Sequence, residues 1–295
     1  MKNSTVLTKL VIFGVGLIGG SFALALRSAG LVRHIVGIGR SQQNLQYALM
    51  HGIIDEIGVD LTAALRNADL VLLAMPVGQT AHVMTQIATH LQANTIITDA
   101  GSTKLEIIAI ARHHLTMQNR HHFVPGHPIA GTEKSGAHAA QKNLYTGKHV
   151  ILTPLPETST DATEKVRQLW QACGAQIAIM SAEQHDQILA ATSHLPHILA
   201  FTMMNHLRHT NSDLAHLLQF SGSGLRDFTR IAGSSPEMWR DICLTNREIL
   251  LQQIDKYMYE LKLLRESLEN NDGNALEQFF SKAQHARKDW LKSNH

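Results

Sequence analysis

One histidine stands in a glycine- and proline-rich segment of the kind that can present a catalytic base. His127 lies between Gly126 and Pro128, shortly after the apolar pair Phe123 and Val124. This order predicts a strand that ends in a rigid turn, and such a turn aims an imidazole instead of burying it. Because the chain holds 19 histidines, a loop histidine without a role is the simpler interpretation. The remaining motifs must decide between the two.

A glycine motif near the start of the chain is typical of dinucleotide binding. The apolar run Leu10 to Phe13 predicts a strand, and Gly14-Val-Gly-Leu-Ile-Gly19 follows it and opens a helical pattern. The first glycine permits a tight turn, the second lets a pyrophosphate approach the backbone, and the third lets helix and strand pack closely. The helix N-terminus then faces the anion. The cofactor-binding residues expected here are Gly14, Gly16, Leu17, Ile18 and Gly19.

The end of the second predicted strand, His34 to Gly39, bears on the choice of cofactor. An NAD-binding unit carries an acid at this point for the ribose 2′-hydroxyl, whereas this chain has Arg40 and Ser41. A guanidinium can hold a 2′-phosphate through two hydrogen bonds, and the acid that would repel the phosphate is absent from this position. The sequence therefore favours NADP, and NAD stays open because a solvated loop residue explains Arg40 almost as well.

Strand and helix patterns alternate through the first part of the chain. Such alternation implies a parallel sheet with right-handed crossovers, and ligands collect at the carboxyl ends of its strands. Pro76, Ser102 and His127 all fall at such ends, and Ser102 also has the position of a helix N-cap. Further strands are predicted over residues 69–75, 95–99, 148–153 and 176–180.

From Ser181 onward the pattern is helical, beginning with the capping box Ser181-Ala-Glu-Gln184. We therefore predict a dinucleotide-binding domain over residues 1–181 and an all-helical substrate and dimerisation domain over residues 182–295. A long helix is expected from Pro236 to about Asn270. Its apolar residues recur at alternating steps of four and three, as in a helix that packs along another helix. This stripe predicts a homodimer.

Composition excludes several classes of protein. With 295 residues, of which 44% are hydrophobic, the chain can bury a full core. The net charge of +2 comes from interspersed charges, so nucleic acid is not an expected partner. Cys173 and Cys243 form no metal or disulfide pattern, and the apolar run at the N-terminus is too short to span a membrane. His194 and His197 are rejected as a metal pair because Pro196 disturbs their helical spacing. We expect a cytoplasmic enzyme with a small-molecule substrate, no membrane association and no metal.

Several motifs together resemble the prephenate/arogenate dehydrogenase family of tyrosine biosynthesis. They follow the family's order over essentially the whole chain, and the most specific are His127-Pro-Ile-Ala-Gly-Thr-Glu133 and Thr229-Arg-Ile-Ala232. The resemblance implies an α/β Rossmann-type dinucleotide-binding domain followed by an all-helical dimerisation and substrate domain. The other motifs span residues 14–21, 99–104, 193–197 and 238–241.

The resemblance also implies a reaction. Members oxidatively decarboxylate prephenate to 4-hydroxyphenylpyruvate: hydride leaves C4 for the nicotinamide of NAD(P), carbon dioxide leaves C1, and a phenol results. The new carbonyl at C4 accepts the electrons of decarboxylation, so no metal is required. The protein must supply a base for the 4-hydroxyl, a cation for the carboxylate and a nicotinamide above C4. The alternative is an arogenate or dual cyclohexadienyl dehydrogenase, which gives tyrosine directly.

By motif position, the resemblance assigns roles to individual residues. His127 accepts from the 4-hydroxyl, Ser102 bridges that hydroxyl and the nicotinamide region, and Arg230 binds a substrate carboxylate. His197 contacts the pyruvyl side chain, which favours prephenate because a protonated imidazole repels the ammonium of arogenate. His185, Ser193 and Trp239 match less well, and helix packing explains each of them equally. The remaining substrate-binding positions that the resemblance implies are Thr132, Glu133, Asp227 and Ser193.

Two rival functions have weaker support. A β-hydroxyacid dehydrogenase also joins a dinucleotide domain to a helical one, but it relies on a lysine in the helical half. This chain has no lysine between Lys165 and Lys256. A regulatory module that only senses a dinucleotide needs neither His127 nor Arg230.

Overall fold

The computed structural model describes residues 6–131, 134–210 and 213–293. The chain separates into two compact units, residues 1–247 and residues 248–295. The first unit contains every described strand and the helices as far as α12, and the second consists of most of α13 together with α14. The predicted domain division at residue 181 stays a prediction.

The first unit is built on a six-stranded parallel sheet. Its order is β3-β2-β1-β4-β5-β6, so the chain moves outward from β1 in one direction and then outward from β4 in the other. This is the order of dinucleotide-binding folds, and it confirms the predicted fold class. The strands are β1 (Leu7–Phe13), β2 (Val32–Ile38), β3 (Glu56–Ile57), β4 (Leu70–Leu73), β5 (Ile96–Asp99) and β6 (Phe123–Val124).

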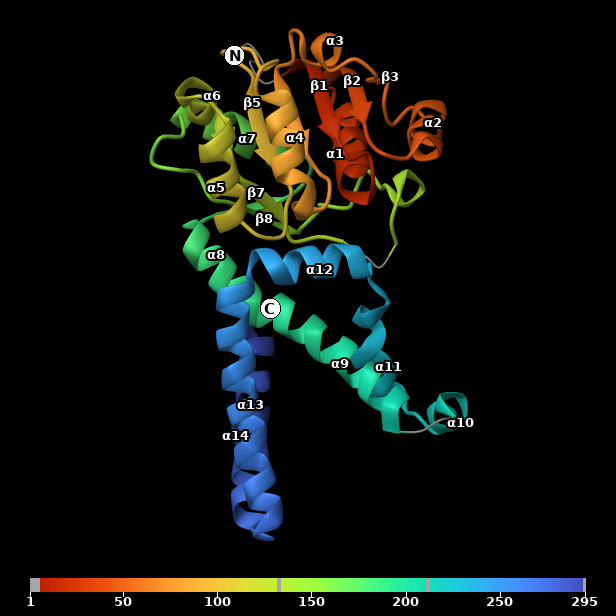
Figure 1. Ribbon diagram of the computed structural model, residues 1–295, viewed down its shortest axis with the longest axis vertical. Helices are drawn as coiled ribbons and strands as arrows, with labels where there is room; N and C mark the ends of the chain where they lie inside the picture. The colour runs from red at the N-terminus through yellow and green to blue at the C-terminus, as the bar shows by residue number, and fades with distance from the viewer. Residues whose placement is uncertain (1–5, 132–133, 211–212, 294–295) are drawn as a thin grey trace. The chain divides into compact units, whose positions relative to one another are not determined.

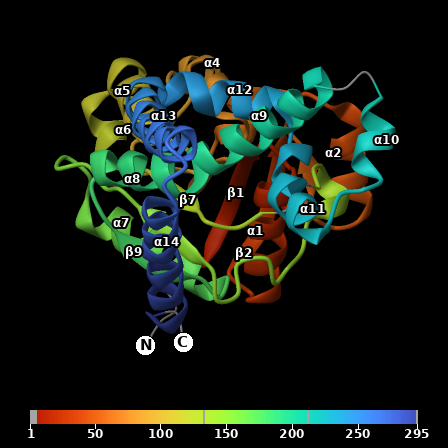
Figure 2. The ribbon, with the colours of Figure 1, turned by 90° about the horizontal axis from the view of Figure 1, so that it is seen from below.

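Helices cover both faces of this sheet (Figures 1 and 2). One face is covered by α1 (Leu17–Ser28), α2 (Gln42–Met50) and α7 (Thr160–Ala172). The other face is covered by α3 (Leu61–Leu65), α4 (Thr80–Ile87) and α5 (Leu105–His114). The short α6 (Met117–His121) precedes β6.

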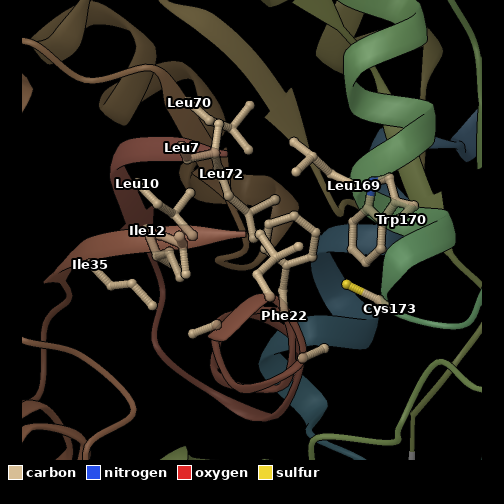
Figure 3. Close-up of a cluster of buried hydrophobic side chains, with 14 of the residues drawn as sticks. Leu7, Leu10, Ile12, Phe22, Ile35, Leu70, Leu72, Leu169, Trp170 and Cys173 are labelled. Carbon is tan, nitrogen blue, oxygen red and sulfur yellow. The ribbon is translucent and has the colours of Figure 1, made fainter. Parts of the chain in front are cut away.

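The two faces hold separate hydrophobic clusters because side chains alternate along each strand. In β1, Leu10 and Ile12 belong to the first cluster, whereas Val11 belongs to the second. Figure 3 shows the first cluster, in which Phe22 of α1 meets Trp170 of α7 with ring centroids 4.5 Å apart. Burial on both faces explains why these strands are continuous apolar runs in the sequence.

A second, three-stranded sheet carries the predicted catalytic histidine. Its strands are β7 (Gly126–Pro128), β8 (His149–Leu152) and β9 (Gln176–Ile179), with β7 antiparallel to β8 and β8 parallel to β9. His127 lies opposite Ile151, so the prediction of a turn at this point is wrong. Gly126 instead lets its strand lie close to the backbone of Asp99, since a Cβ at Gly126 would lie 3.0 Å from the backbone oxygen of Asp99.

The chain is helical after β9, as predicted. The capping box of Ser181 and Gln184 is present and opens α8. Among the described residues, no helix combines the length and the hydropathy that a membrane span requires. The helices are α8 (Ala182–Leu189), α9 (Leu195–Thr210), α10 (Leu214–Leu218), α11 (Ser223–Thr229), α12 (Pro236–Thr245), α13 (Arg247–Glu269) and α14 (Gly273–Ser293). A π-helical turn, Ala190–His194, joins α8 to α9, and 3₁₀ turns span Val77–Gln79, Ala137–Ala139 and Arg230–Gly233.

The long helix expected from Pro236 is interrupted at Asn246, so the prediction of a single helix is wrong. Asn246 is 4% exposed, and its side-chain amide donates to the backbone oxygen of Asp186 at 3.0 Å. The same amide lies 3.2 Å from Nδ1 of His194. A tertiary partner therefore turns this residue inward and ends α12.

Candidate active site

A cavity of about 380 Å³ lies within the first unit, at the carboxyl ends of β4 and β5. Figure 1 shows α12 beside this end of the sheet, and α12 supplies part of the cavity wall. The volume falls in the range of small-molecule sites. Its wall includes Gly16, Leu17, Ile18, Met75, Pro76, Gly101, Ser102, His127, Ser193, His194, Met238 and Trp239.

The glycine motif has the geometry that a dinucleotide needs. Gly14 has a φ of +94°, and a Cβ there would lie 2.6 Å from the backbone oxygen of Ala74. A Cβ at Gly19 would lie 2.8 Å from the side chain of Ile12. Gly16 begins α1, receives no side-chain cap, and has no atom within 4 Å of where its Cβ would be. The first turn of α1 therefore faces the cavity with room for a phosphate group, and these residues fit a dinucleotide.

Arg40 and Ser41 lie outside the described cavity wall. The hydroxyl of Ser41 caps α2 by accepting from the backbone N–H of Asn44 at 3.2 Å. The Arg40 guanidinium donates to the carboxylate of Glu237 at 3.3 Å. The loop after β2 carries no acid, but α12 supplies a carboxylate that faces Arg40.

His127, which is partly exposed, begins a hydrogen-bonded chain of three side chains. Its Nδ1 lies 2.8 Å from Nε2 of His185, and Nδ1 of His185 lies 2.7 Å from Oδ1 of Asp186. His185 and Asp186 are both completely buried. Sequence reasoning ranked His185 low and missed Asp186, whose proximity to His127 depends on the fold of α8 against β7.

The hydrogen bonds determine the tautomer of each ring. The Asp186 carboxylate accepts from the backbone N–H groups of Lys104 and Leu105 at 2.8 and 2.9 Å. An ionised carboxylate has only acceptors, so Nδ1 of His185 must carry the proton that it shares with Asp186. Nε2 of neutral His185 is then an acceptor, and Nδ1 of His127 must donate to it. Nε2 of His127 is consequently the unprotonated nitrogen.

The surroundings keep His127 neutral. Burial lowers its pKa well below the ordinary value of 6.5, and electrostatic interactions with His185, Lys104 and His194 lower that pKa further. Burial likewise lowers the pKa of His194, to about 4. A neutral imidazole with an unprotonated Nε2 is a competent proton acceptor at physiological pH.

A buried ion pair holds the backbone that precedes His127. The ammonium of Lys104 donates to the carboxylate of Asp99, and both side chains are within 2% of complete burial. Lys104 also donates to the backbone oxygen of Gly126 at 2.7 Å, while Asp99 accepts from the Gly126 N–H at 3.1 Å. Both polar groups of Gly126 are thereby fixed by one pair. The lysine and the acid fall in one of the motifs recognised in the sequence, but their role was missed.

Ser102 lies in the cavity wall with His127, but it does not cap a helix. The helix α5 begins at Leu105, and its first N–H groups donate to Asp186. The prediction of an N-cap at Ser102 is therefore wrong. A carboxylate from α8 takes that function, and the partial positive charge of the helix N-terminus stabilises it there.

Ser193 and His194 reach the cavity from the π-helical turn between α8 and α9. Such turns are frequent at functional sites because they change the direction of side chains within a helix. Nδ1 of His194 accepts from Asn246, and its Nε2 is buried without a hydrogen-bond partner among the described residues. His194 therefore lines the cavity with a ring whose Nε2 is itself buried, and the ring also interacts with the backbone of Ser102.

Arg230, His197 and Asp227 are not part of the described wall. His197 stacks on Trp239, with ring centroids 3.9 Å apart and planes at 22°, and Trp239 lies in the wall. Burial lowers the pKa of His197, and the charge of Arg230 lowers it further, so these two residues are neighbours. Asp227 is exposed.

Two of the predicted site residues, Thr132 and Glu133, lie outside the described residues. Within the described ranges, no group of three or more histidine, cysteine, aspartate or glutamate side chains is arranged to hold a metal ion.

Comparison with known proteins identifies the family. Residues 22–179 match the model of the prephenate dehydrogenase nucleotide-binding domain, and residues 181–282 match that of the prephenate dehydrogenase dimerization domain. The chain belongs to the prephenate dehydrogenase family. This membership confirms the resemblance seen in the motifs. It also makes the chain an oxidoreductase with a nucleotide-binding domain.

Relatives in the prephenate dehydrogenase family align over nearly the whole chain. Prephenate dehydrogenase of Bacillus subtilis is 35% identical over 94% of this chain and 75% of its own length. Cyclohexadienyl dehydrogenase of Zymomonas mobilis is also 35% identical, over 99% of this chain and 98% of its own. The structure of prephenate dehydrogenase from Aquifex aeolicus, in complex with hydroxyphenyl propionate and NAD⁺, aligns with a TM-score of 0.90. It is 34% identical and covers 97% of this chain and 99% of that chain.

Proposed function

We propose that this protein is an NAD(P)-dependent prephenate dehydrogenase. It converts prephenate to 4-hydroxyphenylpyruvate and carbon dioxide, with hydride transfer to the nicotinamide, as a step of tyrosine biosynthesis. One observation carries this proposal. The imidazole of His127, which its lowered pKa keeps neutral, lies in the same cavity wall as the glycine turn at Gly16. The names of the relatives support the same reaction.

The chemistry divides between the cofactor and the protein. When bound, the nicotinamide supplies the hydride acceptor. Nε2 of His127 accepts the proton of the 4-hydroxyl as hydride leaves C4, which avoids a protonated carbonyl in the product. Ser102, in the same wall, holds the hydroxyl in line with His127. Trp239, in the wall, excludes water from this end of the cavity.

Arg230 is proposed to bind a substrate carboxylate, with Ser193 and His197 beside it. The support is indirect, since Arg230 acts on the pKa of His197, which stacks on Trp239 in the wall. Thr132, Glu133 and Asp227 complete the substrate-binding set that we propose by motif position. A carboxylate that reaches Arg230 would extend from the cavity past Trp239.

For the cofactor, we propose that NADP is accepted at least as well as NAD. Arg40 follows β2 directly and can reach a 2′-phosphate, whereas an acid for a 2′-hydroxyl is lacking on that loop. Glu237 reduces this preference because its carboxylate competes with the phosphate for the same guanidinium. The Aquifex aeolicus relative binds NAD⁺, so both dinucleotides belong in the test.

The second candidate substrate is arogenate. The Zymomonas mobilis relative is named a cyclohexadienyl dehydrogenase and is as similar in sequence as the prephenate dehydrogenases. The electrostatic argument for prephenate also weakens, because burial and Arg230 lower the pKa of His197 and leave it uncharged near neutral pH. A neutral imidazole does not repel the ammonium of arogenate, so we keep dual use as the alternative.

A spectrophotometric assay that crosses prephenate and arogenate with NAD and NADP tests these proposals. Reduction of either dinucleotide with prephenate supports the function, and a higher kcat/KM with NADP supports the preference. Turnover of arogenate alone would replace prephenate as the substrate, and no turnover with either would refute the function.

A homodimer is proposed from the second unit. Its helices leave large apolar side chains in solvent, and the match to a family dimerization domain, residues 181–282, includes most of this unit as well as the helices before it. Light scattering at micromolar concentration should give twice the chain mass of 32.6 kDa, and a monomer would refute the proposal. The cytoplasmic location expected from the sequence stays a prediction. The exposed apolar residues include Leu251, Met258, Tyr259, Leu261, Leu268, Phe280 and Trp290.

A further inference from the structure

We propose that His127, His185 and Asp186 form a proton relay that exchanges no proton with solvent. The two buried residues fix the tautomer of His127 and share the charge of the proton that His127 removes from the substrate hydroxyl. The proton then returns to the same oxygen atom within one turnover. This inference rests on the proposed function, and it assigns His185 and Asp186 as positioning residues.

The relay is rigid at its far end. Asp186 accepts two backbone N–H bonds from the start of α5, and its own backbone oxygen accepts from Asn246. Its carboxylate therefore cannot turn away from His185 without leaving the N–H groups of Lys104 and Leu105 unpaired in the interior. A buried unpaired donor costs about 1–3 kcal/mol. The hydrogen bond from His185 to Asp186 thus has a fixed direction.

The reaction releases no net proton, so the relay needs no path for a proton to solvent. When hydride leaves C4, the O–H bond of the 4-hydroxyl breaks and an N–H bond forms at Nε2 of His127. When the bond from C1 to the carboxylate breaks, its electron pair enters the ring and the C4 oxygen becomes a phenolate. The phenolate takes the proton back from His127, so no net proton is released. Complete burial of His185 and Asp186 is therefore no obstacle.

The groups around His127 oppose a full positive charge on its ring, so that charge must be shared with His185 and Asp186. A proton on His127 meets the ammonium of Lys104 and the ring of His194, and burial opposes it further. Lys104 is itself paired with Asp99, which also acts on His185. Asp186 offers the imidazolium a compensating carboxylate at the end of two short hydrogen bonds. As Nδ1 of His127 shifts its proton toward His185, the positive charge approaches Asp186.

Two substitutions of His185 separate the parts of the relay. In His185→Gln, the amide oxygen can take the place of Nε2 and accept from His127, but the side chain cannot pass a proton to Asp186. In His185→Leu, both the acceptor and the proton path are lost. His121→Leu is the control for removal of a hydrogen-bonded histidine, because the ring of His121 bonds to the backbone oxygen of Glu157 and does not line the cavity.

The experiment measures single-turnover hydride transfer, KM for prephenate and for the cofactor, melting temperature, and the dependence of the rate on the deuterium fraction of the solvent. We expect a loss of about tenfold in rate for His185→Gln and about a hundredfold or more for His185→Leu, with little change in either KM. The dependence on deuterium should be curved in the wild type, where two protons move, and linear in His185→Gln. His121→Leu should behave as the wild type.

The outcomes separate the relay from the proposed function. Turnover of prephenate by the wild type establishes the function whatever the variants do. Equal rates for the Gln and Leu variants, or a linear deuterium dependence in the wild type, would overturn the relay. If His185→Leu does not fold, the deuterium dependence of the wild type and of His185→Gln decides the matter alone. If the His185 variants melt at a lower temperature but transfer hydride at the wild-type rate, His185 has only a structural role and the relay is also overturned.

Discussion

The pair of Arg40 and Glu237 gives the sharpest test of cofactor choice. Two guanidinium nitrogens of Arg40 lie 3.3 Å from one carboxylate oxygen of Glu237, and the second nitrogen lies 3.5 Å from the other oxygen. The side chains are 69% and 45% exposed. Substitution of Glu237 by Gln removes the competing charge at nearly constant shape, and substitution of Arg40 by Ala removes the proposed phosphate ligand.

The expected magnitudes follow from this exposure. An exposed ion pair contributes about 0.2–1 kcal/mol, so releasing Arg40 in Glu237→Gln should tighten NADP binding by up to about fivefold. A charge-assisted bond to a phosphate contributes about 1.5–3 kcal/mol, so Arg40→Ala should weaken NADP binding by about tenfold to a hundredfold. NAD lacks the 2′-phosphate, and its dissociation constant should change by less than about threefold in either variant.

Fluorescence titration with each dinucleotide, at low and at physiological salt, measures these constants. Glu164→Gln is the matched control, because Glu164 is an equally exposed carboxylate that pairs with an arginine, Arg167, away from the cavity. It should leave both constants unchanged. Equal losses for NAD and NADP in Arg40→Ala would refute the assignment of Arg40 to the 2′-phosphate. Weaker NADP binding in Glu237→Gln would show that the carboxylate orients Arg40 instead of competing for it.

Three further predictions concern the substrate side of the cavity. His127→Ala should lower kcat by about two to four orders of magnitude with a modest change in KM, because a general base is lost, and an unchanged turnover would reject that role. Arg230→Ala should raise KM for prephenate by about tenfold to a hundredfold, and a normal KM would move the carboxylate site elsewhere. The active form of His127 is unprotonated and its pKa is lowered, so kcat/KM should stay level as pH falls through 6.5 and decline only below it. An acid limb centred at or above 6.5 in the pH profile would contradict this environment for His127.

The parallel sheet was predictable from sequence because its information is local. Each central strand is a short apolar run, and the glycine turn after β1 marks the start of α1 within a few residues. The capping box at Ser181 is equally local. These features need only neighbouring residues to be recognised.

The wrong predictions share one cause, which is a contact between residues far apart in the sequence. His127 was expected in a turn because Gly126 and Pro128 suggest one, but β8, more than twenty residues later, pairs with this segment. Asn246 is acceptable within a helix, and its contacts with Asp186 and His194 end the helix. The partner of Arg40 lies 197 residues away. Each outcome is decided by a tertiary contact that no local pattern contains.

The candidate site divides in the same way into a buried part and an exposed part. His127 is fixed by Asp99 and Lys104 on one side and by the His185–Asp186 pair on the other, and these four side chains are buried. Arg230 and Asp227 are exposed and stand on short helical segments. A group that is already positioned loses little entropy during the reaction, whereas an exposed side chain loses more when it binds a substrate. Substitutions around His127 should therefore act mainly on kcat and those near Arg230 mainly on KM. A variant of Lys104 or Asp99 that folds and binds prephenate normally, yet transfers hydride at the wild-type rate, would show that this positioning does not matter.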